Sequence, residues 1–239
     1  MSKTSLLILA LVAASMPSTS ARLFGFLRQQ DCNGQCPNVS PLGDDSFNLD
    51  SFIEKSWFIQ KQQLTPYQQE NQFYCVVATY EKSTDFAGFI DVKNYGNNDA
   101  VNGAIQNSDD PNNSVFARLC AKQLGAGELQ VAPCCFSGSF GTSAGPYWVV
   151  ALDPAYQWAI ISGGQPDQLR TNDAGTTVCT TKSDCTNGSG LWLFTRDKVA
   201  TAATLATMDA KLAELGIYSG DLKTVTQEGC NYDGATLKQ

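Results

Sequence analysis

The chain has 239 residues, no histidine and a formal net charge of −7. This acidic balance, without a dense Lys/Arg cluster, argues against nucleic acid and anionic membrane surfaces as partners, because both require basic patches. The absence of histidine excludes Ser–His, Cys–His and His–metal chemistry, and we expect neither a cofactor nor a bound metal.

The first residues have the features of an export signal. Lys3 is followed by an apolar run over 6–14, and Thr19-Ser20-Ala21 supplies small residues for cleavage. We predict a signal peptide over 1–21, which leaves a chain of 218 residues that carries a charge of −8. The apolar run is too short to cross a hydrocarbon core of about 30 Å, so no stable membrane insertion is expected. The predicted location is extracellular, with the lumen of a secretory-pathway organelle as the alternative.

Nine cysteines follow the predicted signal and indicate a disulfide framework in an oxidising compartment. They are Cys32, Cys36, Cys75, Cys120, Cys134, Cys135, Cys179, Cys185 and Cys230. Zinc binding at Cys32 and Cys36 is disfavoured, because the chain has neither a histidine nor a second compact cysteine pair. Since nine is odd, one thiol stays free or forms a disulfide with another chain. Sequons at Asn38, Asn112 and Asn187 fit a glycoprotein.

Residues 22–49 contain several Gly and Pro breakers and are predicted to form an irregular arm. From about residue 50, short runs rich in β-branched and aromatic residues alternate with turn residues, which is typical of a β-sandwich or barrel. We expect strands at 57–62, 73–80, 88–93, 100–107, 114–122, 128–134, 147–152, 158–162 and 190–195.

One stretch has helical periodicity. Over 201–215 the apolar residues Leu205, Met208 and Leu212 recur at three- and four-residue spacing, and Gly216 follows where a helix C-cap belongs. We predict one amphipathic helix packed on the outside of the sheet, with a partner-binding helix as the less favoured alternative.

Several residues occur in the order and at the spacing of the lipocalin signatures. The matching residues are Trp57, Asp153, Tyr156 and Arg196. Over about residues 36–230 the chain resembles the lipocalin family, most closely its apolipoprotein D-like branch, and more distantly the lipocalin domains of violaxanthin de-epoxidases. Lys55 and Leu152 stand where the family signatures have Gly and Thr.

The resemblance implies a mainly β fold. It would be an eight-stranded antiparallel up-and-down barrel over 50–230, with one C-terminal α-helix outside and a tail over 231–239. In the family, an arginine lies over the signature tryptophan at one end of the barrel. The resemblance therefore implies a stabilising cation–π contact between Arg196 and Trp57, worth about 0.5–2 kcal/mol.

The resemblance also implies a disulfide between Cys75 and Cys230. The family's second bond would join Cys36 to the seventh strand, but residues 162–164 there contain no cysteine. Cys179 and Cys185 are predicted to clamp the hairpin before the last strand. The sequence does not pair the remaining five, which are Cys32, Cys36, Cys120, Cys134 and Cys135.

Positions that match the apolipoprotein D-like branch imply a set of cavity-facing residues, to which we add three aromatic residues of neighbouring runs. The predicted ligand-binding residues are Tyr80, Asn94, Phe116, Phe136, Trp148 and Trp192. For each aromatic residue the alternative is packing on the outer face. The predicted function is a secreted carrier of a small hydrophobic ligand of the fatty acid, sterol, retinoid or carotenoid type.

Two other functions stay open. A lipocalin-fold enzyme, de-epoxidase-like or isomerase-like, could use the odd thiol and a cavity carboxylate, although the chain lacks the long Cys-rich region of the de-epoxidases. A secreted interaction protein could instead use the loops over 138–146 and 163–175.

Overall fold

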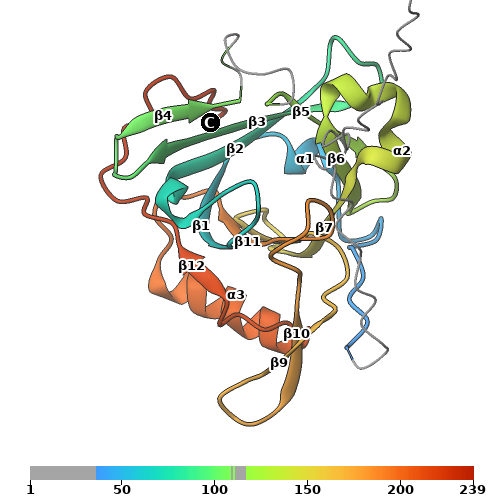
Figure 1. Ribbon diagram of the computed structural model, residues 1–239, viewed down its shortest axis with the longest axis vertical. Coiled ribbons are helices and arrows are strands. Elements are labelled where there is room, and N and C mark those ends of the chain that lie inside the picture. The colour runs from blue at the N-terminus through green and yellow to red at the C-terminus, as the bar shows by residue number, and fades with distance from the viewer. Residues whose placement is uncertain (1–35, 109, 111–116) are drawn as a thin grey trace, which may run out of the picture. The chain divides into compact units, whose positions relative to one another are not determined.

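The computed structural model describes residues 36–108, 110 and 117–239 (Figure 1). Its strands are β1 (Trp57–Gln63), β2 (Tyr74–Lys82), β3 (Ile90–Asn98), β4 (Ala104–Asn107), β5 (Leu119–Gln123), β6 (Glu128–Pro133), β7 (Gly145–Leu152), β8 (Trp158–Ser162), β9 (Gln168–Thr171), β10 (Thr177–Thr180), β11 (Leu191–Thr195) and β12 (Leu222–Thr224). The α-helices are α1 (Leu49–Phe52), α2 (Phe140–Ser143) and α3 (Ala202–Glu214), and two 3-10 helices are η1 (Glu70–Gln72) and η2 (Cys134–Ser139).

Eight strands close into an antiparallel barrel. The hydrogen-bonded order is β11-β8-β7-β6-β5-β3-β2-β1, and β1 pairs with β11 to complete the circle. The strands that neighbour one another in the barrel also follow one another in sequence, apart from the excursions to β4 and to the β9–β10 hairpin. The predicted eight-stranded up-and-down barrel is therefore confirmed.

Alternation along the strands separates the inside of the barrel from the outside. On β2, for example, Val76, Ala78 and Tyr80 pack inside, while Cys75 and Val77 belong to a separate outer cluster. We call the inward set the interior cluster. Its buried members are Phe47, Phe52, Ile53, Trp57, Ile59, Phe73, Val76, Ala78, Tyr80, Ile90, Val92, Ala121, Leu129, Val149, Ala159, Ile161, Phe194 and Val225.

Helix α3 covers one outer wall of the barrel. Met208 and Leu212 are fully buried against outward residues of β8 and β11 such as Ile160 and Leu193. The Thr201 hydroxyl accepts from the Thr204 amide at 3.1 Å and caps the first turn. The chain leaves the helix through Gly216, whose φ of +68° favours glycine. The predicted external C-terminal helix is thus confirmed.

One end of the barrel is closed by α1 and Trp57. The Trp57 side chain is fully buried, and its Nε1 donates to the Phe52 carbonyl at 2.9 Å. The Arg196 guanidinium lies 3.5 Å from the Trp57 ring centroid and donates to the Ser51 and Phe52 carbonyls at 3.1 and 3.0 Å. Burial lowers the pKa of Arg196 to about 10, so the group remains a cation at neutral pH. Lys55 has no positive φ, so its backbone conformation does not require the family's glycine.

The C-terminal segment fills a gap in the barrel wall. β1 and β2 pair only at Trp57 and Phe58 and then separate. Into the gap pass β12 and the residues after it. The Val225 amide donates to the Gln60 carbonyl at 2.9 Å, and the Cys75 amide donates to the Thr226 carbonyl at 2.8 Å. We call residues 222–230 the strap, because the Cys75–Cys230 disulfide ties its end to β2.

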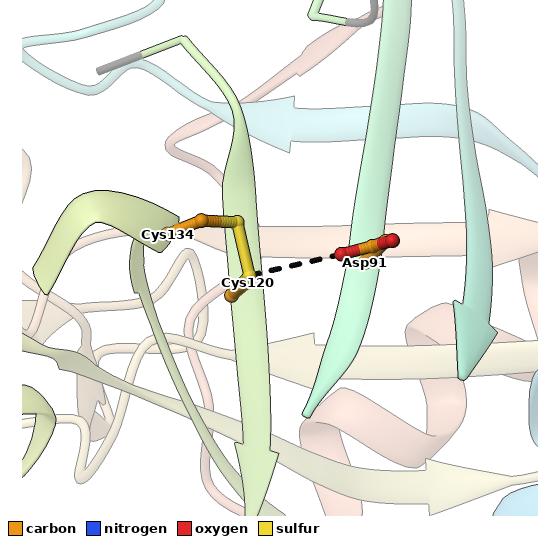
Figure 2. Close-up of side chains that lie close together, drawn as sticks. All are labelled: Asp91, Cys120 and Cys134. Carbon is orange, nitrogen blue, oxygen red and sulfur yellow. Dashed lines mark hydrogen bonds between the residues drawn. A yellow bond between two sulfur atoms is a disulfide. The ribbon is translucent and has the colours of Figure 1, made fainter. Parts of the chain in front are cut away.

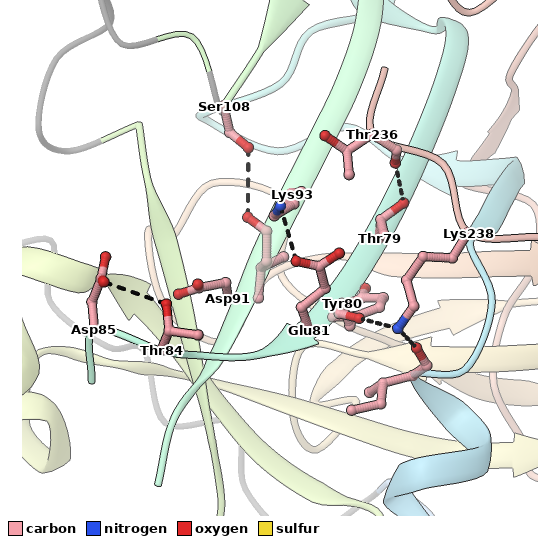
Figure 3. A network of polar contacts seen from close by, with 12 residues as sticks. Thr79, Tyr80, Glu81, Thr84, Asp85, Asp91, Lys93, Ser108, Thr236 and Lys238 are labelled. Carbon is pink, nitrogen blue, oxygen red and sulfur yellow. Dashed lines mark hydrogen bonds and ion pairs between the residues drawn. The ribbon is translucent and has the colours of Figure 1, made fainter. Parts of the chain in front are cut away.

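Beyond the strap, the last residues stay on the barrel wall (Figure 3). The Thr79 hydroxyl donates to the Thr236 carbonyl at 2.7 Å. The Lys238 ammonium donates to the backbone carbonyls of Tyr80, at 3.1 Å, and Ile53. The tail therefore joins the end of β2 to the closed end of the barrel.

The structure contains three disulfides among the described residues: Cys36–Cys179, Cys75–Cys230 and Cys120–Cys134. The expected clamp between Cys179 and Cys185 is wrong. Cys179 lies on β10, where its amide and carbonyl bond to the segment after α3, and its sulfur reaches the N-terminal arm at Cys36. Cys185 lies in the following loop, where its amide donates to Ser189 Oγ. Cys32 lies outside the described residues.

Two expected recognition loops contain regular structure. The stretch 138–146 includes the end of η2 and all of α2, and the stretch 163–175 includes β9, which pairs with β10. The sequon asparagines Asn38 and Asn187 are exposed. The third, Asn112, lies outside the described residues.

Candidate functional site

At the end opposite Trp57, the interior packing ends in partly buried side chains. Five members of the interior packing are only partly buried there, and all lie near the strand ends that point away from α1. They are Leu64, Leu119, Val131, Tyr147 and Trp192, and we call them the mouth ring. Since the barrel is antiparallel, this end brings together the start of β5, β7 and β11 with the ends of β1 and β6. The mouth ring is an apolar surface with one hydroxyl and one indole.

A pair of tyrosines extends from the mouth ring into the barrel: Tyr147 belongs to the ring, and Tyr80 is buried. The Tyr80 and Tyr147 hydroxyl oxygens are 2.7 Å apart, and their ring centroids are 6.3 Å apart in an edge arrangement. Tyr80 is 3% exposed and its ring also packs on Phe52 of the closed end. Burial raises the pKa of both hydroxyls well above the usual value near 10. Both groups are therefore neutral hydrogen-bonding groups over the whole physiological range.

A glutamine adds a second polar group to the interior. β1 has a bulge between Ile59 and Lys61, after which Gln62 lies opposite Trp192 and shares its inward face. Gln62 is fully buried, and its Nε2 donates to Gln68 Oε1 at 2.9 Å. Its own Oε1 has no donor among the described residues. A buried acceptor without a partner costs about 1–3 kcal/mol, so Gln62 Oε1 is a point where a ligand or water would be stabilised.

Three of the predicted ligand-binding residues have inward positions. Tyr80 and Trp192 belong to the interior packing. Asn94 follows Ile90 and Val92 at two-residue spacing on β3, which places it on their inward face, and it is exposed. Sequence reasoning missed Tyr147 and Gln62. Two-residue alternation with the inward Val149 identifies Tyr147 as an inward residue, but only once the bulge between Val149 and Ala151 on β7 is known.

Two of the predicted residues face elsewhere. Trp148 packs in the outer cluster under α3, because it neighbours Tyr147 and so points to the opposite face of β7. Phe136 lies in η2 beyond the end of β6 and is 36% exposed. The Cys120–Cys134 disulfide holds the start of η2 to β5, in an outer cluster with Phe140. The prediction of cavity lining is wrong for both, and Phe116 lies outside the described residues.

One group of side chains has the composition of a metal site (Figure 2). Asp91 and the sulfurs of Cys120 and Cys134 lie within 4.8 Å of one another, with 3.8 Å between Asp91 Oδ1 and Cys120 Sγ. Both sulfurs are joined in a disulfide, so neither is the thiolate that a metal requires. Arg118 neutralises the carboxylate instead, at 3.2 Å from Asp91 Oδ2.

Two described cysteines carry free thiols, Cys135 and Cys185. Cys135 is exposed in η2, and Cys185 is partly exposed in the loop after β10. Burial raises the pKa of Cys185, which reduces its thiolate fraction. Neither thiol belongs to the interior cluster.

The outer surface has a hollow of about 480 Å³ at the closed end. It lies between the N-terminal arm, the β7–β8 turn and α3, and its charged lining residues are Asp44, Asp45 and Lys211. The tyrosine pair and Gln62 do not line it. Inside the barrel, the tyrosine pair and Gln62 converge on an apolar surface. The barrel interior is therefore a better candidate site than the outer hollow.

Comparison with solved structures identifies the fold. Lobster apocrustacyanin A1 aligns with a TM-score of 0.51 and 14% identity, over 84% of this chain and 95% of that one. Apocrustacyanin C2 gives the same values, and apocrustacyanin C1 aligns with a TM-score of 0.50 and 13% identity, over 83% and 94% of the two chains. The chain has the lipocalin fold. No family model and no curated protein matches the sequence.

The lipocalin fold gives the described geometry its context. A closed barrel of eight strands encloses enough space for side chains or one small ligand. In this chain the barrel is completed by Trp57 under Arg196 at one end, the mouth ring at the other and α3 outside. Among the described residues, the structure has no helix that is long and apolar enough to cross a membrane.

Proposed function

We propose that this lipocalin-fold chain is a carrier that binds one small hydrophobic ligand in the barrel, through the mouth ring. The observation that carries the proposal is the asymmetry of the interior. One end has the fully buried Trp57 under Arg196, while the other has the mouth ring and the Tyr80–Tyr147 hydroxyl pair. Such a combination of an apolar wall and few polar groups suits an apolar molecule with one polar end.

Binding on this proposal requires side chains to move. The interior cluster fills the lower barrel, so a ligand gains its volume by displacing partly exposed mouth-ring side chains such as Trp192 and Leu64. The apolar surface that leaves water on binding contributes about 25 cal/mol per Å², so a ligand that buries roughly 300 Å² gains about 7 kcal/mol before ordering costs. A fatty acid, sterol, retinoid or carotenoid has that much apolar surface.

We also propose that the chain is exported and belongs to the apolipoprotein D-like branch. Three disulfides fit an oxidising compartment, and the Cys75–Cys230 bond occupies the positions that the branch implies. Mass measurement of the protein from its natural source tests the export signal. A mature chain that begins after Ala21 supports it, and retention of residues 1–21 contradicts it.

The four tryptophans make a direct test of the site. Trp192 alone belongs to the mouth ring, Trp57 is sealed at the closed end, and Trp148 and Trp158 pack under α3. Brominated fatty acids and sterols quench tryptophan only at contact, so saturable quenching is expected in the native protein. Trp192→Phe removes most of it, and the matched variant Trp158→Phe keeps it. Absence of saturable quenching by every member of the panel, with the fold intact, contradicts the carrier function.

A further inference from the structure

The Tyr80–Tyr147 pair has one hydrogen-bond donor more than it can use. Each hydroxyl carries one proton, and a single hydrogen bond of 2.7 Å joins the two oxygens. One proton lies between the oxygens, and the other points away from the pair. No described side chain or carbonyl accepts it: the only hydrogen bond that either hydroxyl makes in the described part of the chain is the bond between them.

The two hydroxyls differ in exposure, and this difference bears on which of them has the spare proton. Tyr80 is 3% exposed, and its ring is enclosed by Phe52 and Tyr147. Tyr147 is partly exposed and belongs to the mouth ring. Either hydroxyl can donate in this bond; donation by Tyr80 to Tyr147 Oη leaves the proton of the more exposed Tyr147 for an acceptor that enters at the mouth ring. A ligand acceptor would replace water at this proton, and such a hydrogen bond contributes about 0.5–1.5 kcal/mol.

We propose that the Tyr147 hydroxyl, oriented by Tyr80, recognises a neutral carbonyl oxygen on an otherwise apolar ligand. This inference rests on the carrier function and narrows its ligand to aldehydes, ketones and esters. Tyr147 is the binding residue, and Tyr80 is a positioning residue, since its proton fixes the direction of the Tyr147 O–H.

The charges around the pair favour a neutral carbonyl over a carboxylate. Arg196, whose charge acts on the Tyr80 hydroxyl, has its guanidinium on Trp57 and donates to carbonyls of the closed end. The Lys238 ammonium donates to the backbone carbonyls of Tyr80 and Ile53. A carboxylate at the pair would lose its hydration without gaining a direct ion pair, and that loss costs several kcal/mol. The raised pKa values keep both hydroxyls protonated as donors.

The test uses a matched series of ten-carbon ligands: decane, 2-decanone and decanoate. Their affinities for the native protein and for Tyr147→Phe, Tyr80→Phe and Tyr95→Phe are measured by competition with a bound hydrocarbon fluorophore. Tyr95 provides the control, because it packs outside the barrel with Tyr232. Comparing each variant with the native protein for the same ligand removes the differences in hydrophobicity among the ligands.

Loss of one hydrogen bond predicts that Tyr147→Phe weakens 2-decanone about three- to tenfold and changes decane less than about twofold. Tyr80→Phe weakens the ketone less, and Tyr95→Phe changes neither. Decanoate binds more weakly than the ketone at pH 8. Equal losses for decane and 2-decanone in Tyr147→Phe, or tighter binding of decanoate, overturn the inference and leave the carrier function standing. Failure of every ligand to bind the native protein overturns both.

A second measurement does not depend on the variants being stable. The carbonyl stretch of carbon-13-labelled 2-decanone shifts to lower wavenumber when the oxygen accepts a hydrogen bond. Infrared difference spectra of the native complex are expected to show that shift, and Tyr147→Phe is expected to abolish it. A native complex with an unshifted carbonyl band overturns the inference, because the ketone then binds without the hydroxyl.

Discussion

The strap is expected to depend strongly on the disulfide between Cys75 and Cys230. Residues 222–230 fill the gap between β1 and β2, and Gln227 Nε2 donates to the carbonyls of Ile59 and Val76 on both sides of the gap at 2.6 and 2.7 Å. Without the disulfide, these contacts must hold the strap alone. The double variant Cys75→Ala/Cys230→Ala tests how much the covalent bond adds.

Chain entropy gives the magnitude. Cys75 and Cys230 are 155 residues apart, but the Cys36–Cys179 disulfide provides a shorter path. Through it, 39 residues from Cys36 to Cys75 and 51 residues from Cys179 to Cys230 make a loop of about 90 residues. Closing such a loop is worth about 4.6 kcal/mol, against about 3 kcal/mol for the 14-residue separation of Cys120 and Cys134. The strap disulfide therefore contributes about 1.6 kcal/mol more.

Urea unfolding of the native protein, of Cys75→Ala/Cys230→Ala and of Cys120→Ala/Cys134→Ala, with free thiols alkylated, measures the difference. Removal of Cys75–Cys230 lowers the free energy of unfolding by about 4.6 kcal/mol, which corresponds to roughly 10–20 °C in Tm for a chain of this size. Amide exchange at Val225 and Thr226 accelerates more than at β7. Equal losses in the two double variants, or a larger loss without Cys120–Cys134, refute the loop-length reasoning.

Three further predictions concern the closed end and the interior. Arg196→Met removes the cation over Trp57 and leaves several carbonyls without donors, so the free energy of unfolding falls by about 3 kcal/mol or more in urea titrations. Gln62→Met removes the unpartnered Oε1 together with the Nε2 hydrogen bond to Gln68, so the two effects offset and the free energy of unfolding changes by less than about 1 kcal/mol; a loss above about 2 kcal/mol would show that Oε1 has a donor. Folding raises the pKa values of Tyr80 and Tyr147. Their contribution to the free energy of unfolding is therefore complete below pH 10, and it is lost as the pH rises further, by up to about 1.4 kcal/mol per pH unit for each tyrosine. The double Phe variant, unfolded in urea between pH 9 and 11, should lose that slope.

Much of the fold could be predicted because local signals agree with the tertiary structure. The apolar spacing over 201–215 and the glycine after it give α3 almost to the residue, and the strands of the barrel are bounded by turn residues. The irregular parts could not be predicted in this way. The strap has only three residues of strand, and its place between β1 and β2 depends on contacts with residues far away in the sequence.

Disulfide pairing shows the same limit. Cys179 and Cys185 are close in sequence, which suggests a local clamp, but the arm brings Cys36 to Cys179 across a separation of 143 residues. The pairing depends on where the N-terminal arm meets β10, and no local pattern in the sequence gives that position. The Cys75–Cys230 pair was accessible only through the resemblance to a family.

The candidate site shows where reading strand faces succeeds and where it fails. Glu81 on β2 and Lys93 on β3 are polar and mark the outside there, which agrees with the inward positions that the resemblance implies for the neighbouring Tyr80 and Asn94. β7 has α3 over its outer wall, so both of its faces are apolar and the alternation disappears from the sequence. A shift of one residue then exchanges the two faces, and Trp148 is chosen in place of Tyr147. Tyr147, whose hydroxyl we propose as the donor to the ligand carbonyl, was therefore not predicted, because α3 makes the outer face of its strand as apolar as the inner face.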